Sequence, residues 1–107
     1  MSAIYLIARP APKLPLDAAN GTYENDCCGT VTLRDGTMLF RNHEVAYAIE
    51  RDKGGAYVLP QAYVGVEPGH GLQIERNRNV LKLRLDDEKH PETISVLGRN
   101  KEYRFTR

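Results

Sequence analysis

The residues with the strongest chemical character are the adjacent cysteines Cys27 and Cys28. Neighbouring side chains of a strand point to opposite faces of the sheet, and the phase of Val31 and Leu33 predicts Cys27 inward and Cys28 outward. A disulfide between neighbours needs a distorted backbone, so it would form only in a turn. The pattern therefore favours a small core residue at 27 and an incidental thiol at 28 over a disulfide. Both cysteines are redox or thiol candidates.

Histidine is the other residue type that suggests a site. His43, His70 and His90 each lie in an expected loop, and the chain has no Cys-x-x-Cys or His-x-x-x-His spacing. A metal needs three or four converging ligands, so we expect no metal site and no other cofactor. His70 lies between two glycines in a flexible loop tip, so we keep it, with His43 and Tyr63, as a ligand-binding candidate.

No catalytic constellation is recognisable. Neither Ser2 nor Ser95 lies in a Gly-x-Ser-x-Gly elbow. The acidic run at 86–88 is typical of a solvated turn and contains no marked acid and base pair. A cysteine nucleophile would need a histidine brought close by folding, which leaves Cys28 with a loop histidine as an alternative. We assign no catalytic residues.

The charge balance argues against a dedicated nucleic-acid-binding protein. The 107 residues carry 15 Lys and Arg against 14 Asp and Glu, a formal net charge of +1. A duplex-binding protein usually carries a basic face that neutralises several phosphates. Basic residues could share a surface with tyrosines for single strands, but Lys82 and Arg84 fit the polar face of a strand better. We expect no nucleic-acid partner.

Alternation of apolar and polar residues recurs from Gly21 onward, and no long stretch has helical spacing. The clearest hairpin joins residues 30–34 to 37–41 through Asp35-Gly36, a dipeptide that adopts the positive φ angles of a two-residue turn. This turn pairs Leu33 with Met38 on the core face. Further strands are expected at 45–50 and 56–59, a bend at Pro60, and two more hairpins, over 72–85 and 94–105.

These strands define the expected fold class. The chain is predicted to be all-β, a single small antiparallel meander of seven or eight strands closed as a barrel, with a β-sandwich as the alternative. Closure is favoured because it removes exposed strand edges. We place the β domain at residues 21–107 and a tether-like segment at residues 1–20.

The tether interpretation depends on the order of residues at the N-terminus. An apolar run from Ala3 to Ala8 precedes Arg9 and a Pro-rich stretch. Six apolar residues cannot span a bilayer, and no complete signal peptide is present. The order is nevertheless typical of the trailing end of a membrane anchor followed by a semi-rigid linker. We expect a tether truncated in this chain, with a first strand or a loose terminus as the alternative.

The opening of the domain carries a family resemblance. Gly21-Thr22-Tyr23, Cys28-Gly29 and Leu33 followed by Asp35-Gly36-Thr37 resemble the first hairpin of small lipocalin-like β-barrels of bacterial envelope lipoproteins, including the copper-resistance and envelope-stress type. The resemblance implies a barrel tethered to the envelope and facing the periplasm. That group carries Cys-x-x-Cys where this chain has adjacent cysteines, so no redox or metal role is carried over.

The functional expectation is a non-enzymatic binding or interaction module of the bacterial cell envelope or periplasm, with a protein or small ligand as partner. Such a module should have a ligand-sized cavity or an exposed apolar patch. One alternative is a small thiol-dependent redox protein or enzyme that uses Cys28 with a loop histidine. Another is a structural subunit of an oligomer, and a cytoplasmic location is the alternative to the envelope.

Overall fold

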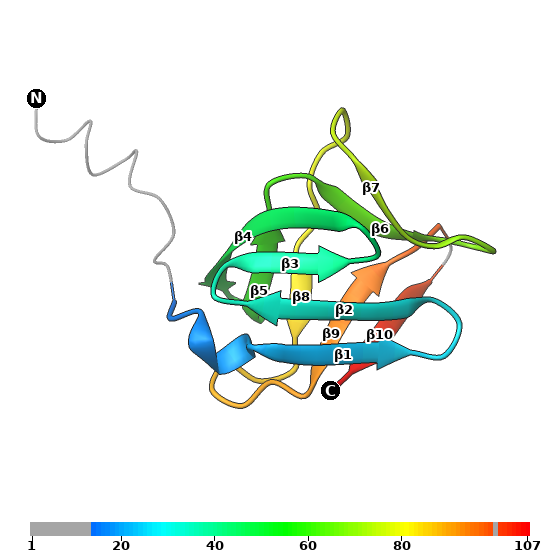
Figure 1. Cartoon of the computed structure of the whole chain (residues 1–107). Coiled ribbons are helices and arrows are strands. Elements are labelled where there is room, and N and C mark those ends of the chain that lie inside the picture. Colours follow the sequence, from blue (N-terminus) through cyan, green and yellow to red (C-terminus); the bar gives the residue numbers. More distant parts are fainter. Residues whose placement is uncertain (1–13, 100) are drawn as a thin grey trace, which may run out of the picture.

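The computed structural model describes residues 14–99 and 101–107. In these residues a short 3₁₀ turn is followed by ten strands (Figure 1). The elements are η1 (Asp17–Ala19), β1 (Gly21–Asn25), β2 (Gly29–Arg34), β3 (Thr37–Phe40), β4 (His43–Asp52), β5 (Gly55–Pro60), β6 (Tyr63–Glu67), β7 (Gly71–Glu75), β8 (Leu83–Leu85), β9 (Thr93–Leu97) and β10 (Glu102–Thr106).

The predicted all-β barrel is confirmed. Eight of the strands in the described residues form a closed antiparallel barrel in the order β1, β10, β9, β8, β5, β4, β3, β2. Successive barrel strands are neighbours, as in a meander, except that the β6–β7 hairpin is inserted between β5 and β8. The hairpin forms its own two-stranded sheet at one side of the barrel (Figure 1).

The predicted first hairpin has the predicted register. Leu33 pairs with Met38, and both side chains are buried. Asp35 and Gly36 have φ angles of 47° and 94°, as a two-residue turn with the right-handed strand twist requires. Since a slip of one residue would move every apolar side chain to solvent, this turn fixes the inward face of two barrel strands.

The hairpin predicted over 72–85 is wrong. β7 pairs with β6 through the loop that contains Pro68 and Gly69, whereas β8 pairs with β5 and β9. Pro60 ends β5, as expected of a residue without an N–H, and the chain bends there into β6. The segment 76–82 then returns to the barrel wall. Local alternation identified these strands but could not show which of them pair.

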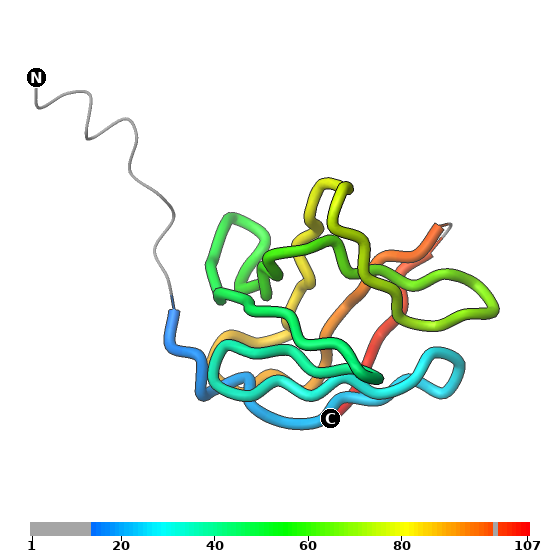
Figure 2. The backbone as a smooth tube through the Cα atoms, turned by 45° about the horizontal axis from the view of Figure 1, so that its top comes forward, coloured from blue at the N-terminus to red at the C-terminus, as the bar shows by residue number. Residues whose placement is uncertain are grey.

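The barrel interior is filled by side chains. Inward residues of all eight barrel strands join one buried cluster, together with Val64, Val66 and Leu72 of the β6–β7 hairpin. Ala19 of η1 joins the same cluster. Figure 2 shows the hairpin on one side of the barrel and η1 on another. The interior is therefore a packed core to which both additions contribute.

Barrel closure joins the first strand to the last. Glu24 pairs with Thr106, and the buried rings of Tyr23 and Phe105 lie inside the closed wall. Arg107, directly after β10, donates from its guanidinium to the carbonyls of Asn20 (2.6 Å) and Pro91. These contacts tie the C-terminus to the start of β1 and to the loop before β9.

Residues 14–20, which the sequence interpretation assigns to the tether, contact the barrel. The amide of Leu14 donates to the carbonyl of Ile49 (2.8 Å), and Ala19 accepts a hydrogen bond from the Tyr23 hydroxyl (2.8 Å). The expected apolar run at 3–8 lies outside the described residues. Within the described ones, no helix is long and apolar enough to cross a membrane.

Arg107→Ala should lower the free energy of unfolding by about 1–3 kcal/mol, because two carbonyls lose a charged donor. Arg107→Lys should recover only part of it, since an ammonium lacks the guanidinium fork. Urea unfolding measures both. Arg34→Ala, an exposed change at the β2–β3 turn, should stay within about 0.5 kcal/mol of the parent. Equal effects of the two alanine substitutions would contradict this role of Arg107.

Candidate functional site

The two cysteines lie in the turn between β1 and β2, which Asn25 organises. Its side-chain oxygen accepts the Cys27 amide (2.9 Å), and its backbone carbonyl accepts the Cys28 amide (3.1 Å). Its side-chain nitrogen donates to the carbonyl of Arg104 on β10 (2.8 Å). The turn ends at Gly29, whose φ of 103° is a conformation that glycine adopts without steric penalty. Asn25 therefore fixes the turn and links it to the last strand.

Cys27 and Cys28 form a vicinal disulfide. The predicted orientation is wrong: Cys27 is exposed, and Cys28 is 8% exposed and belongs to the core cluster. The strand phase does not extend through the turn, because the positive φ of Gly29 interrupts it. The predicted incidental thiol at Cys28 is likewise wrong, since both sulfurs are bonded. The turn supplies the distorted backbone that a bond between neighbours needs.

Two other loops meet the disulfide turn. A Cβ added to Gly71 would lie 2.9 Å from the Cys28 carbonyl oxygen and 3.1 Å from the Arg41 guanidinium. Arg41 in turn donates to the carbonyl of His70. The β1–β2 turn and the tip of the β6–β7 hairpin lie on the same side of the barrel (Figure 2). The fold thus brings Cys28 close to the loop of His70.

The other two sequence candidates, His43 and Tyr63, contact different residues, and Tyr63 lies at the end of the β6–β7 hairpin away from His70. His43, at the start of β4, packs its ring against Phe40 with 5.5 Å between centroids. Tyr63, at the start of β6, lies under the guanidinium of Arg78, 4.0 Å from the ring centroid. In the part of the chain that the structure describes, neither ring is hydrogen bonded to a cysteine.

Sequence reasoning missed Arg41 and Asn25. Arg41 occupies the β3–β4 turn with a φ of 53°, which is uncommon for a residue with a side chain. From this turn its guanidinium donates a hydrogen bond to the carbonyl of His70 in the β6–β7 loop. Asn25 could have been noticed as a turn-forming residue before the cysteines, because asparagine side chains often bond to the backbone two residues on. No local signal marks the reach of Arg41.

A groove of about 510 Å³ lies beside the disulfide. One wall comes from the end of β1 and the disulfide turn, and the other from β10. The lining residues are Glu24, Asn25, Asp26, Cys27, Lys101, Glu102, Tyr103, Arg104 and Thr106. Within the described residues the β1–β10 ladder consists of the single pair Glu24 and Thr106. The groove therefore marks where the closing seam of the barrel parts.

A second, more apolar groove of about 420 Å³ lies over β8, the segment before it and β9, and reaches the start of β10. It is lined by Val80, Leu81, Lys82, Arg84, Ser95, Leu97 and Glu102. Val80 and Leu97 are 40% and 45% exposed. Glu102 lines both grooves, so the start of β10 separates two concave surfaces.

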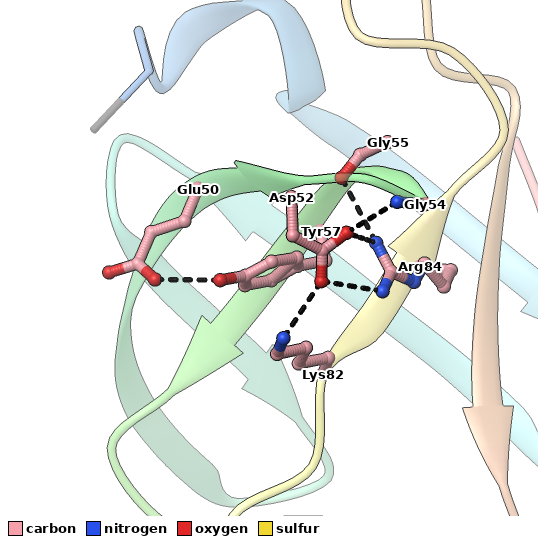
Figure 3. A network of polar contacts seen from close by, with 7 residues as sticks. All are labelled: Glu50, Asp52, Gly54, Gly55, Tyr57, Lys82 and Arg84. Atoms are coloured by element: carbon pink, nitrogen blue, oxygen red, sulfur yellow. Dashed lines mark hydrogen bonds and ion pairs between the residues drawn. The ribbon is translucent and has the colours of Figure 1, made fainter. Parts of the chain in front are cut away.

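A polar network on the outer wall involves Asp52 and the expected basic residues (Figure 3). The Asp52 carboxylate accepts both terminal nitrogens of Arg84 (2.6 and 2.8 Å), the Lys82 ammonium (2.8 Å) and the Gly54 amide (2.8 Å). The cations also lie over the buried Tyr57 ring, with Lys82 4.7 Å from its centroid. All these groups have partners, so the network ties the β4–β5 turn to β8 rather than offering free cations.

The described residues contain no group of three or more His, Cys, Asp or Glu side chains arranged to hold a metal ion. Comparison of the chain with protein-family models, with curated proteins and with solved structures found no match. The functional argument below is based on the disulfide turn and on the groove beside it.

Gly71→Ala should destabilise the protein more than Gly69→Ala. Both glycines have positive φ, +76° and +84°, which should cost about 1 kcal/mol for an alanine at either position. A Cβ at Gly69 meets nothing within 4 Å, whereas one at Gly71 meets the Cys28 carbonyl. We expect at least about 1 kcal/mol of further loss for Gly71→Ala by urea unfolding. Equal losses would show that the loops do not touch.

Protonation of Asp52 should make the stability of the fold depend on pH. Hydrogen bonds from Arg84 and then Lys82 hold the pKa of Asp52 well below its ordinary value of 3.8. The carboxylate therefore stabilises the fold above pH 3.8, and that contribution is lost as the pH falls toward the depressed folded pKa. Asp52→Asn should lower the thermal midpoint at pH 7, with the difference from the parent shrinking below pH 3.8. A constant difference at all pH values would contradict this origin.

Proposed function

We propose that this protein is a non-enzymatic binding or interaction module of the bacterial cell envelope, and that its binding surface is the groove beside the disulfide turn. The filled interior supports an outer binding surface, because the inward side chains of the barrel and its hairpin occupy the core. The barrel then acts as a scaffold. The loops and the parted seam supply the contacts.

The observation that carries the proposal is the parted seam. Beyond the pair of Glu24 and Thr106, the edge of β10 faces a groove rather than a neighbouring strand. The Arg104 carbonyl already accepts a hydrogen bond from Asn25, so an extended segment of a partner would add to the rest of this edge, toward Glu102, with main-chain hydrogen bonds for affinity and side-chain contacts for selectivity. The groove carries charges of both signs, and its charged lining residues are Glu24, Asp26, Lys101, Glu102 and Arg104. An extended peptide with both acidic and basic residues fits this surface best.

The disulfide supports the envelope part of the proposal. Disulfides persist in oxidising compartments such as the bacterial periplasm and are rare in the cytosol. An exposed bond at Cys27 would be open to cytosolic reductants. The proposed tether is residues 1–20, of which residues 1–13 lie outside the described part of the chain. The envelope location therefore depends on the disulfide and on the resemblance of the first hairpin.

The alternative with a Cys28 thiol and a loop histidine has less support. Its nucleophile would be buried and bonded to Cys27, and in the described residues neither His43 nor His70 has a side-chain hydrogen bond to it. The oligomer alternative predicts contacts between copies of the chain. It is an outcome of the test below.

Site-specific photocrosslinking tests the binding surface. We place a photoreactive benzophenone side chain at Glu102, which lines both grooves, and at Arg34, which lies at the β2–β3 turn. In cells of the native host, irradiation should give a discrete adduct with a second protein from position 102 and none from position 34. Arg104→Glu, combined with the probe at 102, should weaken the adduct.

Two results would contradict the proposal. The same adducts from both positions, or none from either, would remove the groove as a specific binding surface. An adduct from position 102 with twice the mass of the chain would favour the oligomer alternative instead.

A further inference from the structure

The disulfide is accessible from one side only. Cys27 is exposed and lines the groove, whereas Cys28 is 8% exposed and packs in the core. Disulfides are cleaved when a thiolate attacks one sulfur and expels the other, so access decides which sulfur is attacked. This arrangement makes Cys27 the sulfur that an external thiolate reaches and Cys28 the sulfur that leaves.

The surroundings of Cys27 allow a thiolate to approach. Lys101 and Arg104 line the same groove, and both are exposed. The carboxylates of Glu24, Asp26 and Glu102 also line it, so the groove has one more anion than cation. The two cations reduce the repulsion that an approaching thiolate meets from these carboxylates. The groove, at about 510 Å³, has room for the reactive end of a thiol compound.

The fold does not depend on the bond. A disulfide stabilises a protein mainly by restricting the unfolded chain, and the effect is smallest for the shortest loop, which adjacent cysteines close. The turn has independent supports: Asn25 accepts both cysteine amides and donates to Arg104. Cleavage of the bond should therefore leave the barrel folded.

We propose that Cys27–Cys28 is a thiol–disulfide exchange site for dithiol reductants, and that it is entered at the Cys27 sulfur. This inference goes beyond the proposed binding function and does not depend on it. It assigns a reversible modification to the turn that carries one wall of the groove.

The exchange balances in two steps. A thiolate of the dithiol attacks Cys27 Sγ and forms a new S–S bond with it, while the bond to Cys28 breaks and Cys28 Sγ leaves as a thiolate that takes up a proton. The second thiolate of the reductant then attacks the reductant's first sulfur, which is bonded to Cys27 Sγ in the mixed disulfide. Cys27 leaves as a thiolate and is also protonated. The protein disulfide gains two electrons and two protons, and the dithiol is oxidised to a disulfide.

Reduction should loosen one wall of the groove. The backbone of Cys28 lies close to the loop at Gly71, where its carbonyl oxygen would lie 2.9 Å from an added Cβ. Once the bond is broken, the two residues regain independent backbone freedom. We expect the change to be confined to the disulfide turn, the loop at 68–71 and the facing part of β10.

A monothiol identifies the attacked sulfur. The oxidised full chain is treated with glutathione under native conditions and quenched with iodoacetamide, and fragment masses locate both labels. We expect glutathione on Cys27 and the alkyl group on Cys28, with at least about a tenfold preference. Glutathione chiefly on Cys28, or no reaction until urea unfolds the chain, would overturn the proposal.

Dithiothreitol measures the exchange and its consequence. The rate of thiol release should fall several-fold for Lys101→Glu at low salt and stay unchanged for Lys53→Glu, an equal charge change at the β4–β5 turn. The reduced protein should retain its circular dichroism and a cooperative thermal transition. Equal rates for the two variants, or loss of the fold on reduction, would contradict the proposed entry at the groove and its reversibility.

Discussion

Closure of the sheet between its first and last strands is the constraint on which the rest of the structure depends. An open sheet of eight strands would leave unpaired backbone groups along two edges. In a closed barrel the first and last strands pair with each other, so these groups are satisfied wherever the two strands pair. Here the seam is held at one end by the pair Glu24 and Thr106 and by the donors of Arg107. The buried rings of Tyr23 and Phe105 lie inside it. Every barrel strand contributes inward residues to the core that this closure encloses.

Closure also determines where binding can occur. The core is filled by side chains of the barrel, of the β6–β7 hairpin and of η1, so the fold uses its interior for stability. At the other end of the seam, the chain leaves β1 for the disulfide turn before it can pair further with β10. The same seam is thus a structural joint at one end and a groove at the other. Asn25 connects the two, because its side chain bridges to the Arg104 carbonyl.

Local rules predicted much of the fold and little of the site. Asp35-Gly36 determined a hairpin and its register, and alternation identified the inward side chains of β2, β3 and β4. The pairing of β5 with β8 depends on contacts between residues far apart in the sequence, such as Asp52 with Arg84. The local alternation of apolar and polar residues does not indicate such contacts. The predicted orientation of the cysteines is wrong for a different reason. A single glycine with positive φ, Gly29, separates their phase from that of the strand.

Native-state amide hydrogen exchange, followed residue by residue along β1 and β10, would show directly whether the seam is joined at one end and parted at the other. The amides of Glu24 and Thr106, which pair across the joined end, should exchange only with a free energy near that of global unfolding. The amides of Asp26 and Glu102, beside the groove, should exchange through local fluctuations at a much lower free energy. Uniform protection along the whole seam would contradict a parted end and, with it, the proposed binding surface.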